Sequence, residues 1–322
     1  MSHVSRRRFV GAAAGAAFAS AFNLPRMLKA AGTPTTKTVI LPIAPRLQWN
    51  ELNGYCGECS IQQAALYFGT YVSQAACRAI VNPNQQTEVL VAVNDQTVLA
   101  ALRLTSAEYN YNLAPAPQFP SYFAWIKQHI QAGHPVMIVA FADWGTDPSY
   151  DHIMLATGFS SIDSTTYHPN DRLYFNDNFY NTPENRTAST LADTQAMAGN
   201  GAHYEFCLPL QTDYGCAVTG IWDASHAALP VQIYLRSSSE PDLIAGAHPI
   251  PLDAIVTVTG LTIGQSYSLY RYNDYHSVPT QDYSKSHYTT VTKFVPTKTV
   301  AAFSVGIPSN SVAVFRCLPA GK

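Results

Sequence analysis

Charged side chains are scarce in this chain of 322 residues, and long apolar runs are missing beyond its N-terminus. Asp, Glu, Lys and Arg supply only 12% of the residues against 47% that are hydrophobic, which excludes a disordered, highly charged chain. After residue 31 no apolar run approaches the length of a transmembrane helix. Residues 1–31 hold five basic residues and no acidic ones, so the rest has 14 basic against 21 acidic residues, a net charge of −7. Such an acidic chain lacks the basic surface that nucleic-acid binding requires.

The motifs of metal and nucleotide chemistry are also missing. The ten histidines are dispersed without a His-x-x-x-His pair, so we expect no metal site and no other cofactor. There is no Gly-x-x-x-x-Gly-Lys phosphate loop. The pair Cys56-x-x-Cys59 could form a redox motif of thioredoxin type, but the βαβ pattern that normally carries it is absent.

The first 31 residues predict an export signal. Three consecutive arginines in Ser5–Val10 resemble the twin-arginine motif, and a short alanine-rich apolar run over 11–22 contains a small-x-small cleavage pattern. We therefore expect a periplasmic or extracellular protein with no stable membrane insertion after the signal is removed. Export permits disulfides among the six cysteines. The sequence leaves their connectivity open, and two pairs are plausible: Cys59 with Cys77, and Cys207 with Cys216.

Hydrophobic periodicity divides the remainder into two parts. Helical patterns come first, followed by strand patterns. The expected helices are 56–69, 73–80, one capped by Asn94-Asp95 and one capped by Ser121, and the expected strands are 135–141, 151–158 and 172–177. From residue 221 every apolar segment is β-branched and aromatic: 231–235, 255–259, 266–272, 288–295, 300–305 and 312–317. The order predicts an α+β domain over 32–220 and an all-β sandwich over 221–322.

The most informative stretch runs from Gln48 to Gly69. A polar, turn-rich segment ends in Cys56, and a helical pattern starts directly behind it. Unpaired backbone amides and the positive end of the helix dipole stabilise a thiolate at this position. The pattern therefore predicts a nucleophile that is reactive near neutral pH. A structural cysteine at a buried helix start would produce the same pattern.

Two further polar positions could complete a catalytic group. Thiol-dependent hydrolysis needs an imidazole base, a group that orients the imidazole, and donors for the oxyanion. His152 begins one expected strand, and the next ends in Asn176-Asp177-Asn178. One of these three side chains could accept a hydrogen bond from the histidine ring and fix its tautomer, and the choice between Asp177 and Asn176 stays open. The alternative for His152 is a histidine that is part of the core, and the alternative for Asp177 is an ordinary turn residue.

Four stretches resemble, in order, the bacteriocin-leader-processing cysteine peptidases (peptidase family thirty-nine of the cysteine class) and their stand-alone relatives in the papain-like superfamily. These stretches are Gln48 to Gly69, Ala132 to Val139, Asp151 to Phe159 and Leu173 to Asp177. The resemblance implies a papain-like fold and cleavage of a peptide or isopeptide bond in a peptide or protein substrate. It implies Cys56 as nucleophile, His152 as base, Asp177 as orienting group and Gln48 as oxyanion donor beside the Cys56 backbone amide.

Several alternatives stay open from the sequence. A papain-style alignment would place the nucleophile at Cys59 and the oxyanion donor at Asn53. Glu58 occupies the position of a family proline and sets a carboxylate near the thiol. The same fold could catalyse acyl transfer to an amine or thiol. A third possibility is a catalytically inactive binding or adhesion protein, whose C-terminal domain contacts a surface or polymer through the tyrosine-rich tract Tyr270–Tyr275.

Overall fold

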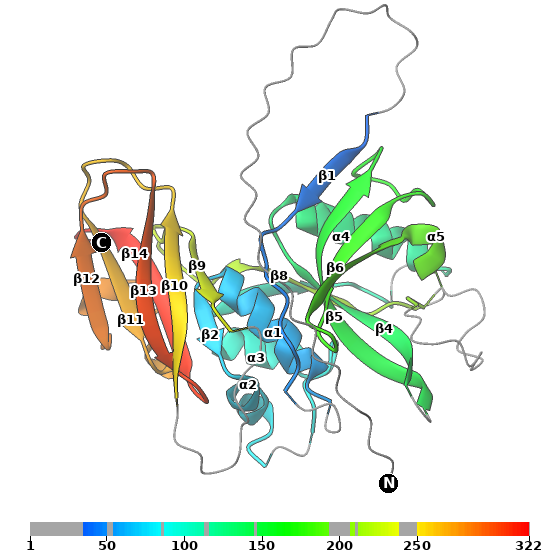
Figure 1. The fold of residues 1–322 in the computed structure, drawn as a ribbon, viewed down its shortest axis with the longest axis horizontal. Helices are drawn as coiled ribbons and strands as arrows, with labels where there is room; N and C mark the ends of the chain where they lie inside the picture. The colour runs from blue at the N-terminus through cyan, green and yellow to red at the C-terminus, as the bar shows by residue number, and fades with distance from the viewer. Residues whose placement is uncertain are drawn as a thin grey trace, which may run out of the picture. The chain divides into compact units, whose positions relative to one another are not determined.

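We describe the chain from a computed structural model that covers residues 35–49, 54–84, 87–112, 116–144, 147–192, 207–209, 212–237 and 250–321, with backbone only for 142–144 and 147–150. Residues 36–322 form one compact unit. Its elements mix helices and sheets, as expected for an α+β chain (Figure 1). The expected export signal, residues 1–31, lies outside the described residues.

The helices follow the predicted apolar periodicity. They are α1 (Cys56–Tyr67), α2 (Gln74–Val81), α3 (Asp95–Ala101), α4 (Phe119–Gln131) and the single turn α5 (Ala188–Leu191). Ser73 begins α2 as its cap, because its hydroxyl accepts the backbone N–H of Ala76 at 3.1 Å. The cap predicted for α4 is wrong. Ser121 lies inside the helix, which begins earlier because Pro120 fits the first turn.

The larger sheet is antiparallel and runs in the order β3-β8-β4-β5-β6-β7, with β1 paired to β5. Its strands are β1 (Lys37–Ile40), β3 (Leu104–Glu108), β4 (Val136–Trp144), β5 (Asp147–Ser161), β6 (Arg172–Asp177), β7 (Thr182–Thr187) and β8 (Gly215–Ile221). The strands are longer than the expected 135–141 and 151–158, because β4 and β5 stay paired as far as Trp144 opposite Asp147. His152 therefore lies within β5 rather than at its start.

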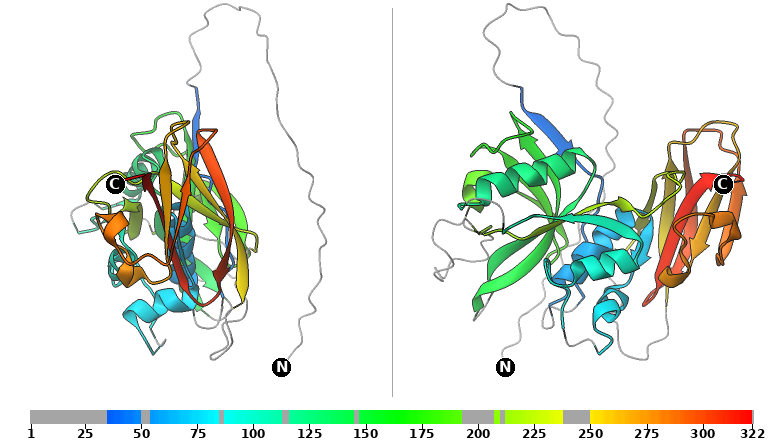
Figure 2. Two further views of the ribbon diagram at one scale, coloured as in Figure 1. Left: turned by 90° about the vertical axis from the view of Figure 1, so that its left-hand side faces the viewer. Right: turned by 180° about the vertical axis from the view of Figure 1, so that it is seen from behind.

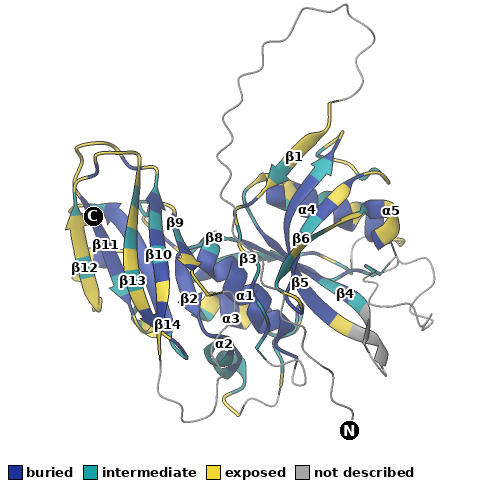
Figure 3. Ribbon diagram, in the orientation of Figure 1, coloured by how far each residue is buried: buried dark blue, intermediate teal, exposed yellow. Residues whose placement is uncertain are grey.

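Helices cover both faces of this sheet. Alternate residues of a strand point to opposite faces. On one face Ile138 and Met154 pack with α4 residues such as Phe123, and Figure 2 shows α4 lying across these strands. On the other face Met137 and Leu155 join a core that includes α1. Helix α1 also contacts the strands β2 (Thr70–Val72) and β9 (Val231–Leu235), which leaves it buried along almost its whole length (Figure 3).

The described strands between residues 231 and 319 belong to two smaller antiparallel sheets. One has the order β13-β10-β9 and the other β12-β11-β14-β2. Their further strands are β10 (Pro251–Thr259), β11 (Tyr267–Tyr272), β12 (Thr290–Phe294), β13 (Val300–Pro308) and β14 (Val312–Pro319), with short 3-10 turns at Tyr275–Ser277 and Tyr283–Lys285. Each of the six expected C-terminal runs contains a strand. Because β2 comes from residues 70–72, one sheet combines both parts of the chain, and the domain boundary near residue 220 stays a prediction.

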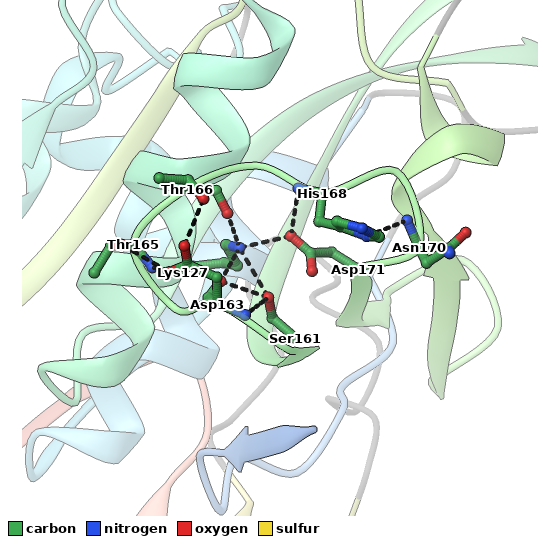
Figure 4. Close-up of polar contacts among 8 residues, drawn as sticks. All are labelled: Lys127, Ser161, Asp163, Thr165, Thr166, His168, Asn170 and Asp171. Carbon is green, nitrogen blue, oxygen red and sulfur yellow. Dashed lines mark hydrogen bonds and ion pairs between the residues drawn. The ribbon is translucent and has the colours of Figure 1, made fainter. Parts of the chain in front are cut away.

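A buried lysine holds the loop after β5 against α4. Lys127, inside the helix, forms an ion pair with Asp171 at 2.6 Å and donates to the carbonyl groups of Asp163 at 2.7 Å and Thr166 at 2.5 Å (Figure 4). It also donates to the Ser161 hydroxyl at 3.1 Å. An ammonium group has three N–H donors, and these partners use them fully. Burial of this charge is therefore compensated, and the loop is fixed between the end of β5 and the start of β6.

Candidate active site

Helix α1 begins at Cys56, where the chain passes beneath residue 89. Cys56 is only 2% exposed. A Cβ atom added at Gly57 would lie 2.0 Å from the Val89 carbonyl oxygen, far inside van der Waals contact. Glycine is therefore required directly after the cysteine, because the backbone around Val89 lies across the helix start.

Burial governs the ionisation of Cys56. Burial, together with a smaller effect of the carboxyl groups of Glu58 and Glu88, raises the pKa of the thiol to about 12. Backbone hydrogen bonds from Ile153 and Gly57 lower it by a smaller amount. The net direction is opposite to the one expected from a helix N-terminus, because loss of water disfavours a buried thiolate more than the helix amides favour it. The resting sulfur is therefore a thiol.

Glu58 is held by a buried partner rather than directed freely at the sulfur. Its carboxylate pairs with Arg78 of α2 at 2.6 Å and accepts the Val89 N–H at 3.0 Å. The Arg78 guanidinium lies over the Tyr55 ring, 3.5 Å from its centroid. This cluster connects α2 and the segment around Val89 to the first turn of α1, so Glu58 stabilises the start of the helix.

His152 lies between a carboxylate and an aromatic ring. Its Nε2 is 3.8 Å from Asp177 Oδ1, and its ring stacks on Phe179 at 3.8 Å with an interplanar angle of 5°. The separation of 3.8 Å between these two atoms is longer than an ordinary hydrogen bond. Burial lowers the pKa of His152, and Asp177 offsets part of that effect. The resting imidazole is neutral near pH 7.

Asn176 and Asp177, the two candidates for the group that orients His152, contact different neighbours. Asn176 donates to Gln63 Oε1 at 2.8 Å and to the Ile43 carbonyl at 3.2 Å. Asp177 accepts the Phe179 N–H at 2.8 Å through the oxygen that faces His152. The carboxylate of Asp177 is therefore the group beside the imidazole, while the Asn176 amide is engaged with α1 and the lead-in segment.

Gln48 presents a buried carboxamide. The residue is 2% exposed, and neither Nε2 nor Oε1 has a hydrogen-bond partner among the described residues. Its backbone N–H donates to the Asn178 carbonyl at 2.8 Å. Leaving a buried amide unsatisfied costs about 1–3 kcal/mol. Such a group is suited to a partner that arrives with a ligand.

Asn178 joins these residues, in a role that the sequence did not indicate. Its Nδ2 donates to the Cys56 carbonyl at 3.1 Å and to the Ile153 carbonyl, next to His152, at 3.0 Å. The backbone carbonyl of Asn178 accepts the Gln48 backbone N–H at 2.8 Å. The loop Asp177–Asn178–Phe179 thus touches each segment that carries a candidate catalytic residue. The only sequence signal was a third polar residue at the end of an expected strand.

Cys59 lies in different surroundings from Cys56. Its thiol donates to the Arg46 carbonyl at 3.4 Å, and Gln63 Nε2 lies 3.6 Å from its sulfur. Asn53, its expected oxyanion donor in the papain-style alignment, lies outside the described residues. The structure contains no disulfide between Cys56 and Cys59, between Cys59 and Cys77, or between Cys207 and Cys216.

Comparison with known proteins places the chain in a family. No curated protein and no solved structure matches the chain. Within the described ranges, no helix is both long and apolar enough to cross a membrane. A family model described as Peptidase_C39 like family matches residues 40–202, which include the elements that carry Gln48, Cys56, His152 and Asp177. Because this match spans just over half of the 322 residues, the chain belongs to the Peptidase_C39 like family.

Proposed function

We propose that the chain is an exported, thiol-dependent peptidase that cleaves a peptide or isopeptide bond in a peptide or protein substrate. Membership of the family suggests cysteine peptidase activity. The observation that carries the proposal is the loop Asp177–Phe179. Through its carboxylate, amide and backbone it contacts His152, the Cys56 carbonyl and the Gln48 backbone.

In the proposed reaction the Cys56 sulfur attacks the substrate carbonyl carbon while its proton passes to His152. The Asp177 carboxylate stabilises the imidazolium that forms. The Gln48 amide and the Cys56 backbone N–H donate to the developing oxyanion. The C–N bond then breaks, and the amine leaves with the proton from His152. Water hydrolyses the thioester with His152 again acting as base, which releases the acid and restores the thiol.

The electrostatics favour a neutral resting pair over a preformed thiolate–imidazolium pair. Burial raises the thiol pKa of Cys56 and lowers the pKa of His152, and both changes keep the proton on sulfur. Proton transfer is then coupled to attack, and charge develops only in the presence of the oxyanion donors. This is general-base catalysis of a thiol nucleophile.

The test is digestion of a peptide library derived from a proteome, with new termini identified by mass spectrometry. We expect wild-type protein to generate cleavages that Cys56→Ser and His152→Ala abolish and that Cys59→Ser retains. A loss confined to Cys59→Ser would move the nucleophile to Cys59. Products that appear only with an added amine or thiol would identify an acyl transferase. Binding of peptides without cleavage would favour the inactive binding protein.

We extend the proposal to the two ends of the chain. Removal of residues 1–31 during export is tested by sequencing the N-terminus of protein recovered from the periplasm or medium. For residues 221–322 we propose a β-sandwich that positions substrate or contacts a surface polymer. One buried cluster supports this assignment because it draws residues from both smaller sheets, such as Val256 of β10 and Phe315 of β14.

A further inference from the structure

Gln48, the oxyanion donor of the proposed reaction, lies in a segment without regular secondary structure. The described residues Leu47, Gln48 and Trp49 belong to neither a helix nor a strand. Their backbone is therefore placed by individual hydrogen bonds rather than by a helix or a sheet ladder. The Gln48 carboxamide has no hydrogen-bond partner among the described residues, so this side chain does not anchor the segment. The backbone on either side of Gln48 determines where its side chain starts.

Gln74, the first residue of α2, holds the backbone on both sides of Gln48. Its Oε1 accepts the Trp49 N–H at 2.8 Å, and its Nε2 donates to the Leu47 carbonyl at 3.0 Å. The Leu47 carbonyl belongs to the peptide group before the Gln48 Cα, and the Trp49 N–H belongs to the peptide group after it. One carboxamide thus restrains both planar units that set the φ and ψ angles of Gln48. The Gln48 N–H adds a third restraint, because it donates to the Asn178 carbonyl at 2.8 Å.

Gln74 is itself fixed by its surroundings. The residue is fully buried. It follows Ser73, whose hydroxyl caps α2 and whose backbone N–H donates to the Ser311 carbonyl at 2.9 Å. Directly before Ser73, β2 pairs with β14, with Val72 opposite Val312. The start of α2 is therefore anchored to a strand from the C-terminal part of the chain, and this anchor places the Gln74 carboxamide.

The same face of α2 also holds the chain next to Cys56. Arg78 lies four residues after Gln74, so the two side chains leave the helix on one face. Its Nη2 donates to the Gly54 carbonyl at 2.5 Å, two residues before Cys56. Helix α2 therefore contacts the backbone beside both Gln48 and Cys56, and the two bonds of Gln74 are the ones that act on Gln48.

We infer that Gln74 is a positioning residue that places the Gln48 carboxamide to receive the oxyanion. The catalytic consequence rests on the proposed function, whereas the restraint on Gln48 rests on the hydrogen bonds alone. Loss of one oxyanion donor costs about 100- to 1,000-fold in kcat. Loss of Gln74 should cost less, about 10- to 100-fold, because Gln48 is then displaced rather than removed. Since the oxyanion forms only in the transition state, kcat should fall while KM stays nearly constant.

The test is a double-mutant cycle of Gln74→Met and Gln48→Ala, measured as kcat on a peptide from the library digest. Methionine has about the length and volume of glutamine and lacks the carboxamide. We expect Gln74→Met to lower kcat by about 10- to 100-fold in the wild-type background, but by less than about threefold when Gln48 is alanine. Equal factors in the two backgrounds would overturn the inference, because a purely structural role does not depend on Gln48.

Two further variants accompany the cycle. Gln118→Met is the matched control, because the buried Gln118 amide likewise donates to one backbone carbonyl, of Tyr111, and accepts one backbone N–H, of Asp213. It should lower the Tm and leave kcat unchanged. Gln74→Glu keeps the oxygen that accepts the Trp49 N–H, so its kcat should lie between those of wild type and Gln74→Met. This variant keeps the test valid if Gln74→Met does not fold.

Amide hydrogen exchange separates this inference from the proposed function, because it does not depend on catalysis. Exchange at the Gln48 N–H reports its bond to Asn178, which Gln74 does not make. We expect Gln74→Met to speed this exchange at least about tenfold, and Gln118→Met to leave it unchanged. An unchanged rate in Gln74→Met would overturn the inference even if the wild-type protein cleaves peptides. Faster exchange in a protein that cleaves no peptide would support the restraint by Gln74 and overturn the proposed function instead.

Discussion

Replacing Asn178 by alanine separates the positioning of the candidate active site from its stability. The substitution removes the hydrogen bonds from Nδ2 to the Cys56 and Ile153 carbonyls, at 3.1 and 3.0 Å. The Ile153 carbonyl still accepts from the Ser60 hydroxyl at 3.2 Å, so it is not left without a donor. At about 1 kcal/mol per hydrogen bond, the free energy of unfolding should fall by about 2 kcal/mol. For a unit of this size the Tm should fall by about 4–8 °C.

Activity should fall by more than this loss of stability explains. Asn178 fixes the start of α1 relative to β5, and a misplacement of about 1 Å at a reacting group can cost about 100-fold in rate. We therefore expect kcat/KM, measured on a peptide from the library digest well below the Tm, to decrease by about 10- to 100-fold.

Asn176 provides the matched control. It is equally buried and also donates two hydrogen bonds, but these reach Gln63 and Ile43 rather than Cys56 and Ile153. Asn176→Ala should lower the Tm by a similar amount and reduce kcat/KM only slightly. If both variants retain wild-type kcat/KM, or lose it equally, the positioning role of Asn178 is refuted.

Three further predictions concern burial. Since the Cys56 pKa is raised to about 12, iodoacetamide at pH 7 should alkylate Cys56 about a thousandfold more slowly than an ordinary thiol of pKa about 9. Fast labelling that depends on His152 would instead show a thiolate–imidazolium ion pair. Gly57→Ala should misfold or lose several kcal/mol, because the added Cβ meets the Val89 carbonyl, and unchanged chemical denaturation would contradict this contact. Burial raises the pKa of Asp213 to about 8, so the folded state binds more protons than the unfolded state between pH 4 and 8, and stability falls as the pH rises. Asp213→Asn should therefore raise the Tm relative to wild type by more at pH 8 than at pH 4, and a constant difference would show an ordinary pKa.

Local patterns predicted the elements that depend mainly on short-range periodicity. Helix α1 begins at Cys56 as expected, and β9, β11 and β14 fall within or next to their predicted runs. The approach of Asp177 to His152 follows from the pairing of β5 with β6, which places consecutive strands side by side. The alternation of apolar residues and the positions of the strand ends were therefore sufficient to predict most of the larger sheet.

Features that depend on distant partners could not be predicted in this way. Lys127 lies beside the apolar residues of its helix, four residues after Phe123 and three before Ile130, but the loop around Asp171 that pairs with its charge comes from a distant part of the chain. Strand β2 has only three residues and exists because β14 pairs with it. The raised pKa of Cys56 depends on the segment around Val89, which no local pattern places over the helix start.

Burial also changes the part that the N-terminus of α1 plays in the proposed reaction. With Cys56 protonated at rest, the amides at the start of the helix have no thiolate to stabilise. A full ion pair inside the protein would require desolvation of both charges, which is costly even when they attract each other. A neutral thiol and imidazole avoid this cost until the sulfur attacks. Negative charge then moves from sulfur to the substrate oxygen, where the Cys56 N–H and the buried Gln48 amide can donate to it. On this mechanism the helix terminus contributes to catalysis by stabilising the oxyanion in the transition state rather than the thiolate in the ground state, and only the former interaction accelerates the chemical step.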